Sequence, residues 1–306
     1  MNAVVVIGDA NVDLSVRLPA RSGNREQPPP PVLTLGGTAA NTAVALAQLG
    51  VGVSFIGMVG DDGYGRFVRR ELDALQIDTR QLHAHAEAFT TQVLAIVDAD
   101  GERTLFGWPR RGSALTYLEP AQISADVIAQ AQWLHTTGMC LVESPTRDAI
   151  LHAMTVARDS GVPVSFDLNL RIGFRDGRFE SGFIDTIERA ITLSDVVLGS
   201  AVDELSHLGA DWQTVVRRLC QERTVVARLG NEGVRAYFGD QEVAMPAIVV
   251  PVISTLGAGD AFNAGFIAAM VEIRGLKAAL ARGNAVAALK ISGQPIDAAS
   301  VKALSA

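Results

Sequence analysis

The sequence predicts an α/β fold with a doubly wound, mostly parallel sheet flanked by helices. Short runs rich in β-branched residues alternate with helix-length segments whose apolar residues recur at helical spacing. This alternation is typical of a parallel sheet that is covered by helices on both faces. With 306 residues, 48% of them hydrophobic, the chain is long enough to bury a substantial core. The clearest strand-like runs are Val4–Ile7, Val53–Ile56, Trp133–His135, Val164–Phe166, Val196–Leu198 and Thr224–Ala227.

Two segments depart from this alternation and predict a small additional sheet. Apolar and polar residues alternate from Val12 to Leu18, and the proline run 28–31 follows. Farther along, Thr91–Val97 and Arg103–Phe106 flank an Asp-Gly turn, which is typical of a β-hairpin. The same residues are also compatible with ordinary edge strands.

Polar side chains follow several of the predicted strands. Asp13, Asp167 and Asn169 each come just after a strand-like run. In open α/β sheets, ligands bind outside the carboxyl ends of the strands. We therefore expect a functional site at this edge of the sheet.

The most informative stretch is Ser254–Phe262, in which a glycine-rich turn leads into an apolar helix. Gly257, Ala258 and Gly259 leave backbone N–H groups accessible, and the positive end of the helix dipole adds to them, so the turn can neutralise phosphate charge. Asp260 lies in the first helical turn, where these donors favour its ionised form and where it can accept a proton from a nearby hydroxyl. An aspartate here is equally typical of a simple helix cap.

A second glycine cluster, Gly36–Asn41, precedes a helix that is predicted to end at Gly50. Small residues in the opening turn allow a ligand to approach the backbone closely. They also allow tight packing of a helix on a sheet, which is the structural alternative.

These two motifs, in this order, resemble those of the ribokinase-like (PfkB) carbohydrate kinases. Gly36–Asn41 is similar to the family's N-terminal motif, and Thr255–Asp260 to its C-terminal Thr-x-Gly-Ala-Gly-Asp motif. The resemblance extends over essentially the whole chain, with supporting segments at Gly8–Asp13, Gly60–Gly65, Asp167–Arg171, Leu229–Gly233 and Gly283–Ala288.

The resemblance implies one ribokinase-like domain over residues 1–306. It also implies that about 14–34 and 89–106 form a lid that closes over the sugar. Lids of this family often pair between subunits, so we expect a homodimer.

The resemblance further implies transfer of the γ-phosphoryl group of ATP, with Mg²⁺, to a hydroxyl of a hexose, ketose or pentose. Asp260 is then the base, and Gly257, Ala258 and Gly259 form the anion hole. The implied sugar-binding residues are Asn11, Asp13, Gly36, Gly37, Asn41 and Arg110. The implied nucleotide-binding residues are Gly230, Gly233, Asn284 and Thr255.

Three further side chains have competing interpretations. Arg171 has the guanidinium fork suited to phosphate, but it can also form a surface ion pair. Glu204 resembles the family acid that orders metal-bound water, although Ser200 or Ala201 stands where the family has asparagine, and Glu204 can instead begin a helix. Arg228, where the family often has lysine, receives no role.

The acceptor and the class of protein have alternatives. Trp108–Ala114 is similar to a region of fructokinase-like and keto-deoxygluconate kinase-like members, so a sugar acid is a second candidate acceptor and a nucleoside a third. A sugar-binding regulator without turnover is an alternative of another class. Nicotinamide-dependent dehydrogenases and P-loop kinases are disfavoured, because neither of their glycine motifs is present.

Composition restricts the partners. A net charge of -7 argues against a nucleic-acid surface. No apolar stretch is long enough to span a bilayer, and the start of the chain does not resemble a signal peptide, so we expect a cytoplasmic protein. Cys140 and Cys220 are expected to be reduced packing residues, and the scattered histidines show no metal-ligand spacing.

Ser254 predicts weak dependence on potassium. Many members of the resembled family carry an aspartate at this position that helps to bind a monovalent cation near the anion hole, whereas serine is a neutral and weaker ligand. We expect little change in turnover when KCl replaces choline chloride at constant ionic strength. A steep rise in rate with potassium contradicts this expectation.

Overall fold

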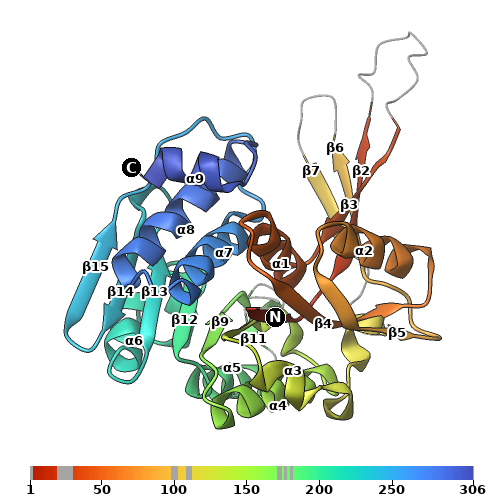
Figure 1. Ribbon diagram of the computed structural model, residues 1–306, viewed down its shortest axis with the longest axis horizontal. Helices are drawn as coiled ribbons and strands as arrows, with labels where there is room; N and C mark the ends of the chain where they lie inside the picture. The colour runs from red at the N-terminus through yellow and green to blue at the C-terminus, as the bar shows by residue number, and fades with distance from the viewer. Residues whose placement is uncertain are drawn as a thin grey trace.

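In the computed structural model of the chain, a large sheet lies between two helical layers, and a small sheet stands beside it (Figure 1). The structure describes residues 3–18, 30–97, 103–107, 112–170, 174–175, 178–179 and 182–305.

The large sheet has nine strands in the described residues, in the order β15-β14-β13-β12-β9-β8-β1-β4-β5. Neighbours from β13 to β5 run parallel, and β14 and β15 run antiparallel. The six strand-like runs predicted from the sequence all lie in the parallel part, so that prediction is confirmed. The strands are β1 Val4–Ile7, β4 Val53–Gly60, β5 Asp78–His85, β8 Trp133–Thr137, β9 Val164–Asp167, β12 Val196–Ser200, β13 Thr224–Arg228, β14 Val234–Phe238 and β15 Gln241–Met245.

Burial on both faces explains why β1, at the centre of the sheet, is continuously apolar. Along β1, Val4 and Val6 pack into one hydrophobic cluster, whereas Val5 and Ile7 pack into the other. Successive side chains of a strand point to opposite faces, so a strand between two helical layers is favoured to be apolar on both sides.

Each face of the sheet is covered by its own set of helices. One face packs against α1 Thr38–Gln48, α2 Gly63–Ala74, α7 Ala258–Val271, α8 Leu276–Ile291 and α9 Ala298–Ser305. The other packs against α3 Ala125–Ala129, α4 Thr146–Asp159, α5 Phe183–Thr192 and α6 Trp212–Leu219. Short 3-10 helices span Ala114–Tyr117, Pro120–Gln122, Gly138–Cys140, Leu205–Leu208 and Gly230–Glu232. A two-stranded sheet pairs β10 Phe174–Arg175 with β11 Arg178–Phe179.

The small sheet has the order β3-β2-β6-β7, which confirms the predicted additional sheet. Its strands are β2 Asn11–Arg17, β3 Val32–Gly36, β6 Gln92–Val97 and β7 Arg103–Gly107. The predicted hairpin is β6–β7, whose Asp-Gly turn lies outside the described residues, as do residues 19–29 of the other segment. Because β2 follows β1 after three residues, the small sheet begins directly at the edge of the large one.

A buried aspartate determines where α1 begins. Gly37, the N-cap residue of α1, has no side chain that could accept hydrogen bonds from the first backbone N–H groups of the helix. Asp9, in the loop after β1, accepts them instead. The Asp9 carboxylate accepts from the backbone N–H groups of Thr38 at 2.9 Å and Ala39 at 3.0 Å, and from the Thr38 hydroxyl at 2.8 Å. Asp9 therefore ties the N-terminus of α1 to the carboxyl end of β1.

We expect Asp9→Ala to lower the free energy of unfolding by about 2 kcal/mol. It removes a cap and leaves the N–H groups of half-buried Thr38 and buried Ala39 without an acceptor. Asp211→Ala is the control, because Asp211 caps α6 at an exposed position by accepting from the Thr214 N–H at 2.6 Å. Urea denaturation of both variants tests the difference, and an Asp9→Ala loss no larger than that of Asp211→Ala contradicts it.

Candidate active site

The glycine-rich turn before α7 has the backbone conformation that glycine favours. Gly257 is the N-cap residue of α7, with a φ of 76° in the left-handed region. A Cβ at this position would also lie 3.1 Å from Cε of Lys290 and 3.7 Å from its Nζ. Glycine thus allows both the turn and the close approach of the Lys290 side chain.

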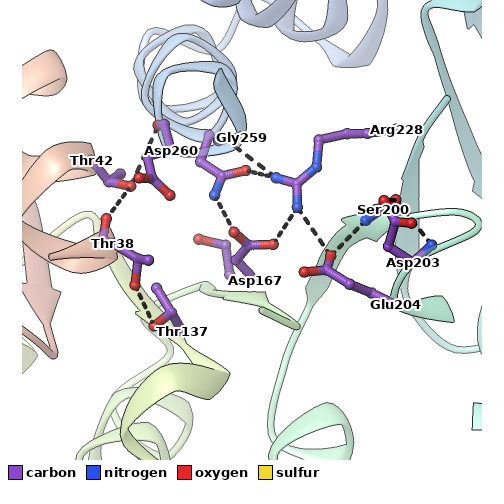
Figure 2. A network of polar contacts seen from close by, with 12 residues as sticks. Thr38, Thr42, Thr137, Asp167, Ser200, Asp203, Glu204, Arg228, Gly259 and Asp260 are labelled. Atoms are coloured by element: carbon purple, nitrogen blue, oxygen red, sulfur yellow. Dashed lines mark hydrogen bonds and ion pairs between the residues drawn. The ribbon is translucent and has the colours of Figure 1, made fainter. Parts of the chain in front are cut away.

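Asp260 connects the two glycine motifs predicted to be functional. It lies in the first turn of α7, and only 7% of the residue is exposed. Its Oδ2 accepts from Nδ2 of Asn41 at 2.9 Å, and the Thr42 hydroxyl donates to its backbone carbonyl at 3.4 Å. Figure 2 shows the starts of α1 and α7 meeting around this side chain. Two motifs more than 200 residues apart in sequence therefore meet at one carboxylate.

Burial raises the pKa of the Asp260 carboxyl to about 7. The hydrogen bond from Asn41 opposes this rise, the negative charges of Asp167 and Asp9 add to it, and the positive charge of Arg228 again opposes it. The sequence-based argument took account of the helix dipole and nearby donors, which favour the ionised form, whereas burial acts in the opposite direction and raises the pKa. A pKa near neutrality is suited to a general base.

One of the three predicted anion-hole donors is already engaged. The Ala258 N–H donates to the Thr255 carbonyl at 3.2 Å, which closes the turn. A phosphate at the turn would have to share or replace this bond.

Three of the predicted sugar-binding residues meet where β2 pairs with β3. Asn11 lies opposite Gly36 in the ladder, and its Nδ2 donates to Oδ1 of Asp13 at 2.7 Å. A Cβ on Gly36 would lie 2.5 Å from that Oδ1 and 2.6 Å from the Asn11 Nδ2, so only glycine leaves room for both polar groups. Burial raises the pKa of Asp13, the Asn11 hydrogen bond opposes the rise, and the charge of Asp9 adds to it.

Gly37 and Asn41 join this cluster to Asp260. The Asn41 backbone N–H donates to the Gly37 carbonyl at 2.8 Å, and Gly37, with a φ of 104°, packs directly against the backbone of Asp9 and Ala10. All predicted sugar-binding residues that the structure describes therefore lie along one path from β2 to the Gly257 turn.

Two of the four predicted nucleotide-binding residues contact the segment after β15. A Cβ on Gly233 would lie 2.7 Å from the Ala247 backbone nitrogen, and Nδ2 of Asn284 donates to the Pro246 carbonyl at 2.8 Å. Gly230 begins the 3-10 turn between β13 and β14. Thr255 is exposed on the loop between this segment and α7.

Arg228, to which sequence reasoning gave no role, is the centre of a buried polar network (Figure 2). Its Nη2 donates to Oδ1 of Asp167 at 2.7 Å and to Oε2 of Glu204 at 3.3 Å. Its Nη1 donates to Oδ1 of Asn263 at 2.9 Å and to the Gly259 carbonyl at 3.4 Å. Burial by itself would lower the pKa of Arg228, but the carboxylates of Asp167 and Glu204 raise it overall.

Glu204 lies at the end of this network. Its Oε2 also accepts from the Ser200 N–H at 2.6 Å, and it precedes a short 3-10 helix. In the described residues, no group of three metal-ligating side chains is found. This arrangement does not provide a protein-only metal site, but it is compatible with a Mg²⁺ ion held mainly by phosphates and water.

Two predicted site residues, Arg171 and Arg110, lie outside the described residues. Conversely, sequence reasoning missed the roles of Asp9, Arg228 and Asn263 in the site. The sequence did contain an indication that Arg228 lies in the site. Arg228 and Asp167 are each the last residue of a parallel strand, and the carboxyl ends of parallel strands lie at one edge of the sheet.

Two other sequence-based expectations concern the rest of the chain. Cys140 and Cys220 are buried thiols that form no disulfide, as expected. In the described part of the chain, no helix combines the length and apolar character needed to cross a bilayer.

The fold and the site define an α/β protein with a glycine-rich turn at a helix N-terminus beside a buried acid. The sequence matches the pfkB family carbohydrate kinase over residues 1–297. The chain therefore belongs to the pfkB family of carbohydrate kinases. It is a phosphotransferase whose acceptor is an alcohol group.

Individual relatives agree with this membership. The fructokinase of Klebsiella pneumoniae is 35% identical over 270 residues, covering 87% of this chain and 83% of the relative. The aminoimidazole riboside kinase of Salmonella typhimurium is 33% identical over 272 residues, covering 87% and 80%. A crystal structure of fructokinase from Vibrio cholerae O395, with fructose, ADP and calcium ion bound, superposes with a TM-score of 0.82 at 27% identity, covering 99% of this chain and 98% of that one.

We expect Asp260→Asn to stabilise the protein increasingly as the pH rises. The folded pKa of about 7 exceeds the ordinary value of 3.8, so this carboxyl contributes most to stability below about pH 4, and the contribution is lost as the pH rises through about 7. The amide of the variant keeps an acceptor for Asn41 and carries no charge. Between about pH 5 and pH 8, the free energy of unfolding of the variant relative to wild type should rise by about 3 kcal/mol.

Urea denaturation at several pH values measures this difference. Asp185→Asn is the control, because Asp185 is an exposed acid in the first turn of α5. A difference between Asp260→Asn and wild type that stays constant across this range contradicts the expectation.

Proposed function

We propose that the protein transfers the γ-phosphoryl group of ATP to a hydroxyl of a free hexose, ketose or pentose, with a ketohexose as the first candidate. The observation that carries this proposal is the Asn41–Asp260 contact, which brings a carboxyl with a pKa of about 7 to the Gly257 turn. Fructokinases among the relatives favour the ketohexose.

In the proposed reaction, the sugar hydroxyl oxygen attacks the γ-phosphorus and its proton passes to Asp260. The bond from the γ-phosphorus to the bridging oxygen breaks, and ADP leaves. The backbone N–H groups of Gly257, Ala258 and Gly259, at the positive end of α7, stabilise the negative charge on the transferring group.

Asn11, Asp13, Gly36, Gly37 and Asn41 form the proposed sugar pocket. One amide and one carboxylate offer both donors and acceptors, which suits a diol. The Asn11–Asp13 hydrogen bond fixes the orientation of both groups before the sugar arrives.

For the nucleotide, we propose contacts with Gly230, Gly233, Asn284 and Thr255. The loop between β15 and α7 supports this placement, because Val249, Val252, Ile253 and Leu256 are all exposed there and can cover an apolar base. A bound Mg²⁺ would neutralise phosphate charge, and Glu204 would order one of its water molecules. Arg171 is proposed to contact the transferring phosphate, and Arg110 the sugar.

We also propose that the small sheet acts as a lid and that two copies pair through it. Val32 of β3, Phe106 of β7 and Leu18, which directly follows β2, support this proposal, because they are apolar and each about half exposed (56%, 49% and 49%). A cytoplasmic location is proposed because ATP is the phosphoryl donor.

Specific observations favour two other acceptors. A riboside kinase among the relatives makes a nucleoside a candidate, and a 2-keto-3-deoxy sugar acid remains one if Arg110 meets a carboxylate. A sugar-binding regulator without turnover is less favoured, because it has no need for a buried base at an anion-binding turn.

The deciding experiment measures ATP consumption with Mg²⁺ across ketoses, aldoses, keto sugar acids and nucleosides. We expect a free sugar to stimulate turnover most, and Asp260→Asn to lower kcat by about 1000-fold, because proton transfer to the base is lost. Asp185→Asn is the control for removal of an acid from a helix N-terminus.

The other outcomes separate the alternatives. Strongest stimulation by a sugar acid or a nucleoside overturns the proposed acceptor and keeps the kinase. Sugar binding without any ATP consumption overturns the kinase and favours the regulator.

A further inference from the structure

Arg228 holds together four parts of the chain that are distant in sequence. It is the last residue of β13, and its guanidinium contacts Asp167 at the end of β9, Glu204 after β12, and Asn263 and Gly259 on α7. The Arg228 side chain is 16% exposed, that of Asp167 2% and that of Glu204 7%. An ion pair this deeply buried is costly to break, because removal of one partner leaves a charge without compensation.

The network reaches the anion-binding turn through α7. Asn263 lies one helical turn after Gly259 and is completely buried. Its Nδ2 donates to Oδ2 of Asp167 at 2.9 Å, while its Oδ1 accepts from Arg228. A Cβ on Gly259 would lie 3.2 Å from Nη1 of Arg228, so the guanidinium packs directly against this turn. Any shift of Arg228 would move the first turn of α7, which carries Asp260.

We propose that Arg228 is a positioning residue of this kinase, whose guanidinium holds the Gly259–Asp260 turn in register with the carboxyl ends of β9 and β12 and supplies a positive charge that offsets part of the charge of the acids beneath it. It acts through the turn and does not contact the sugar. The inference rests on the proposed role of Asp260 as the base.

The charges around Asp260 give this role a signature that a merely structural arginine lacks. Arg228 lowers the pKa of the Asp260 carboxyl, whereas Asp167 and Asp9 raise it. From the other elements packed on this turn, Asn41 of α1 donates a hydrogen bond and Lys290 of α8 lies beside Gly257. Removal of the Arg228 charge should therefore raise the pKa of Asp260, and removal of the Asp167 charge should lower it.

The test compares Arg228→Gln, Arg228→Lys and Asp167→Asn with wild type in the pH dependence of kcat/KM. On the acidic side of this profile, kcat/KM rises as Asp260 loses its proton, with a midpoint expected near pH 7 in wild type. We expect the midpoint of this acidic limb to move up by about one pH unit in Arg228→Gln and down by about one unit in Asp167→Asn. Arg228→Lys keeps the charge, so its limb should stay near that of wild type. Its kcat should nevertheless fall about 10-fold or more, because an ammonium group cannot hold these four partners in the geometry of a guanidinium fork.

The KM for the sugar should change less than kcat in all three variants. The control is Arg235→Gln, which removes an arginine from an exposed pair with Glu242 on the neighbouring strand β14 and should leave the profile unchanged. Limbs that stay at the wild-type position in both Arg228→Gln and Asp167→Asn overturn the inference, as does an Arg228→Lys variant with wild-type kcat.

A second measurement does not depend on turnover. Each variant is compared with a double variant that also carries Asp260→Asn, and the difference between their free energies of unfolding is measured at several pH values. The pH dependence of this difference reports the pKa of Asp260 in that variant. Opposite shifts for Arg228→Gln and Asp167→Asn support the inference even if no acceptor is found, and equal pKa values overturn it. If Arg228→Gln does not fold, Arg228→Lys and Asp167→Asn decide the outcome in the same way.

The two proposals can fail separately. An Asp260→Asn variant with wild-type turnover overturns the proposed function. An inactive Asp260→Asn variant together with unmoved limbs in the Arg228 and Asp167 variants overturns only the positioning role.

Discussion

The hydrogen bond between Asn41 and Asp260 joins the starts of two helices, and the rest of the site depends on this junction. Both α1 and α7 begin at a glycine with positive φ, so each chain segment turns sharply from a loop into its helix. Asp9 fixes the first of these starts from the end of β1, and Arg228 fixes the second from the end of β13. Two rigid helices held in this way present their N-termini to the same small volume.

Electrostatics explains how a chain with a net charge of -7 can bind a nucleotide phosphate. Arg228 offsets part of the negative charge at the site, because its single positive charge pairs with both Asp167 and Glu204. Asp260 is buried enough that its carboxyl is partly protonated near neutral pH. Both effects reduce the repulsion of a phosphate at the positive end of α7, where we propose that the nucleotide phosphates bind.

The proposed sugar-binding groups and the Arg228 network lie on different sheets. The large sheet carries the network under α7 at the carboxyl ends of its strands, and the small sheet carries Asn11 and Asp13 at the beginning of β2. Because only three residues separate β1 from β2, the polar pair lies where the small sheet meets the large one. A movement of the small sheet would thus carry the proposed sugar-binding groups with it, whereas Asp260 lies on α7, which packs on the large sheet.

The sequence by itself determined the fold class, six of the seven parallel strands that the structure describes in the large sheet, and the two glycine motifs. Strands buried on both faces are favoured to be apolar on both sides, and turns with positive φ favour glycine, so both features are local and can be read directly. Only the tertiary structure decided the partners of Arg228, which lie 61, 24 and 35 residues away at Asp167, Glu204 and Asn263. It also decided the protonation of Asp260, because loss of water on burial depends on how α1 and α7 pack and not on the residues beside Asp260 in sequence.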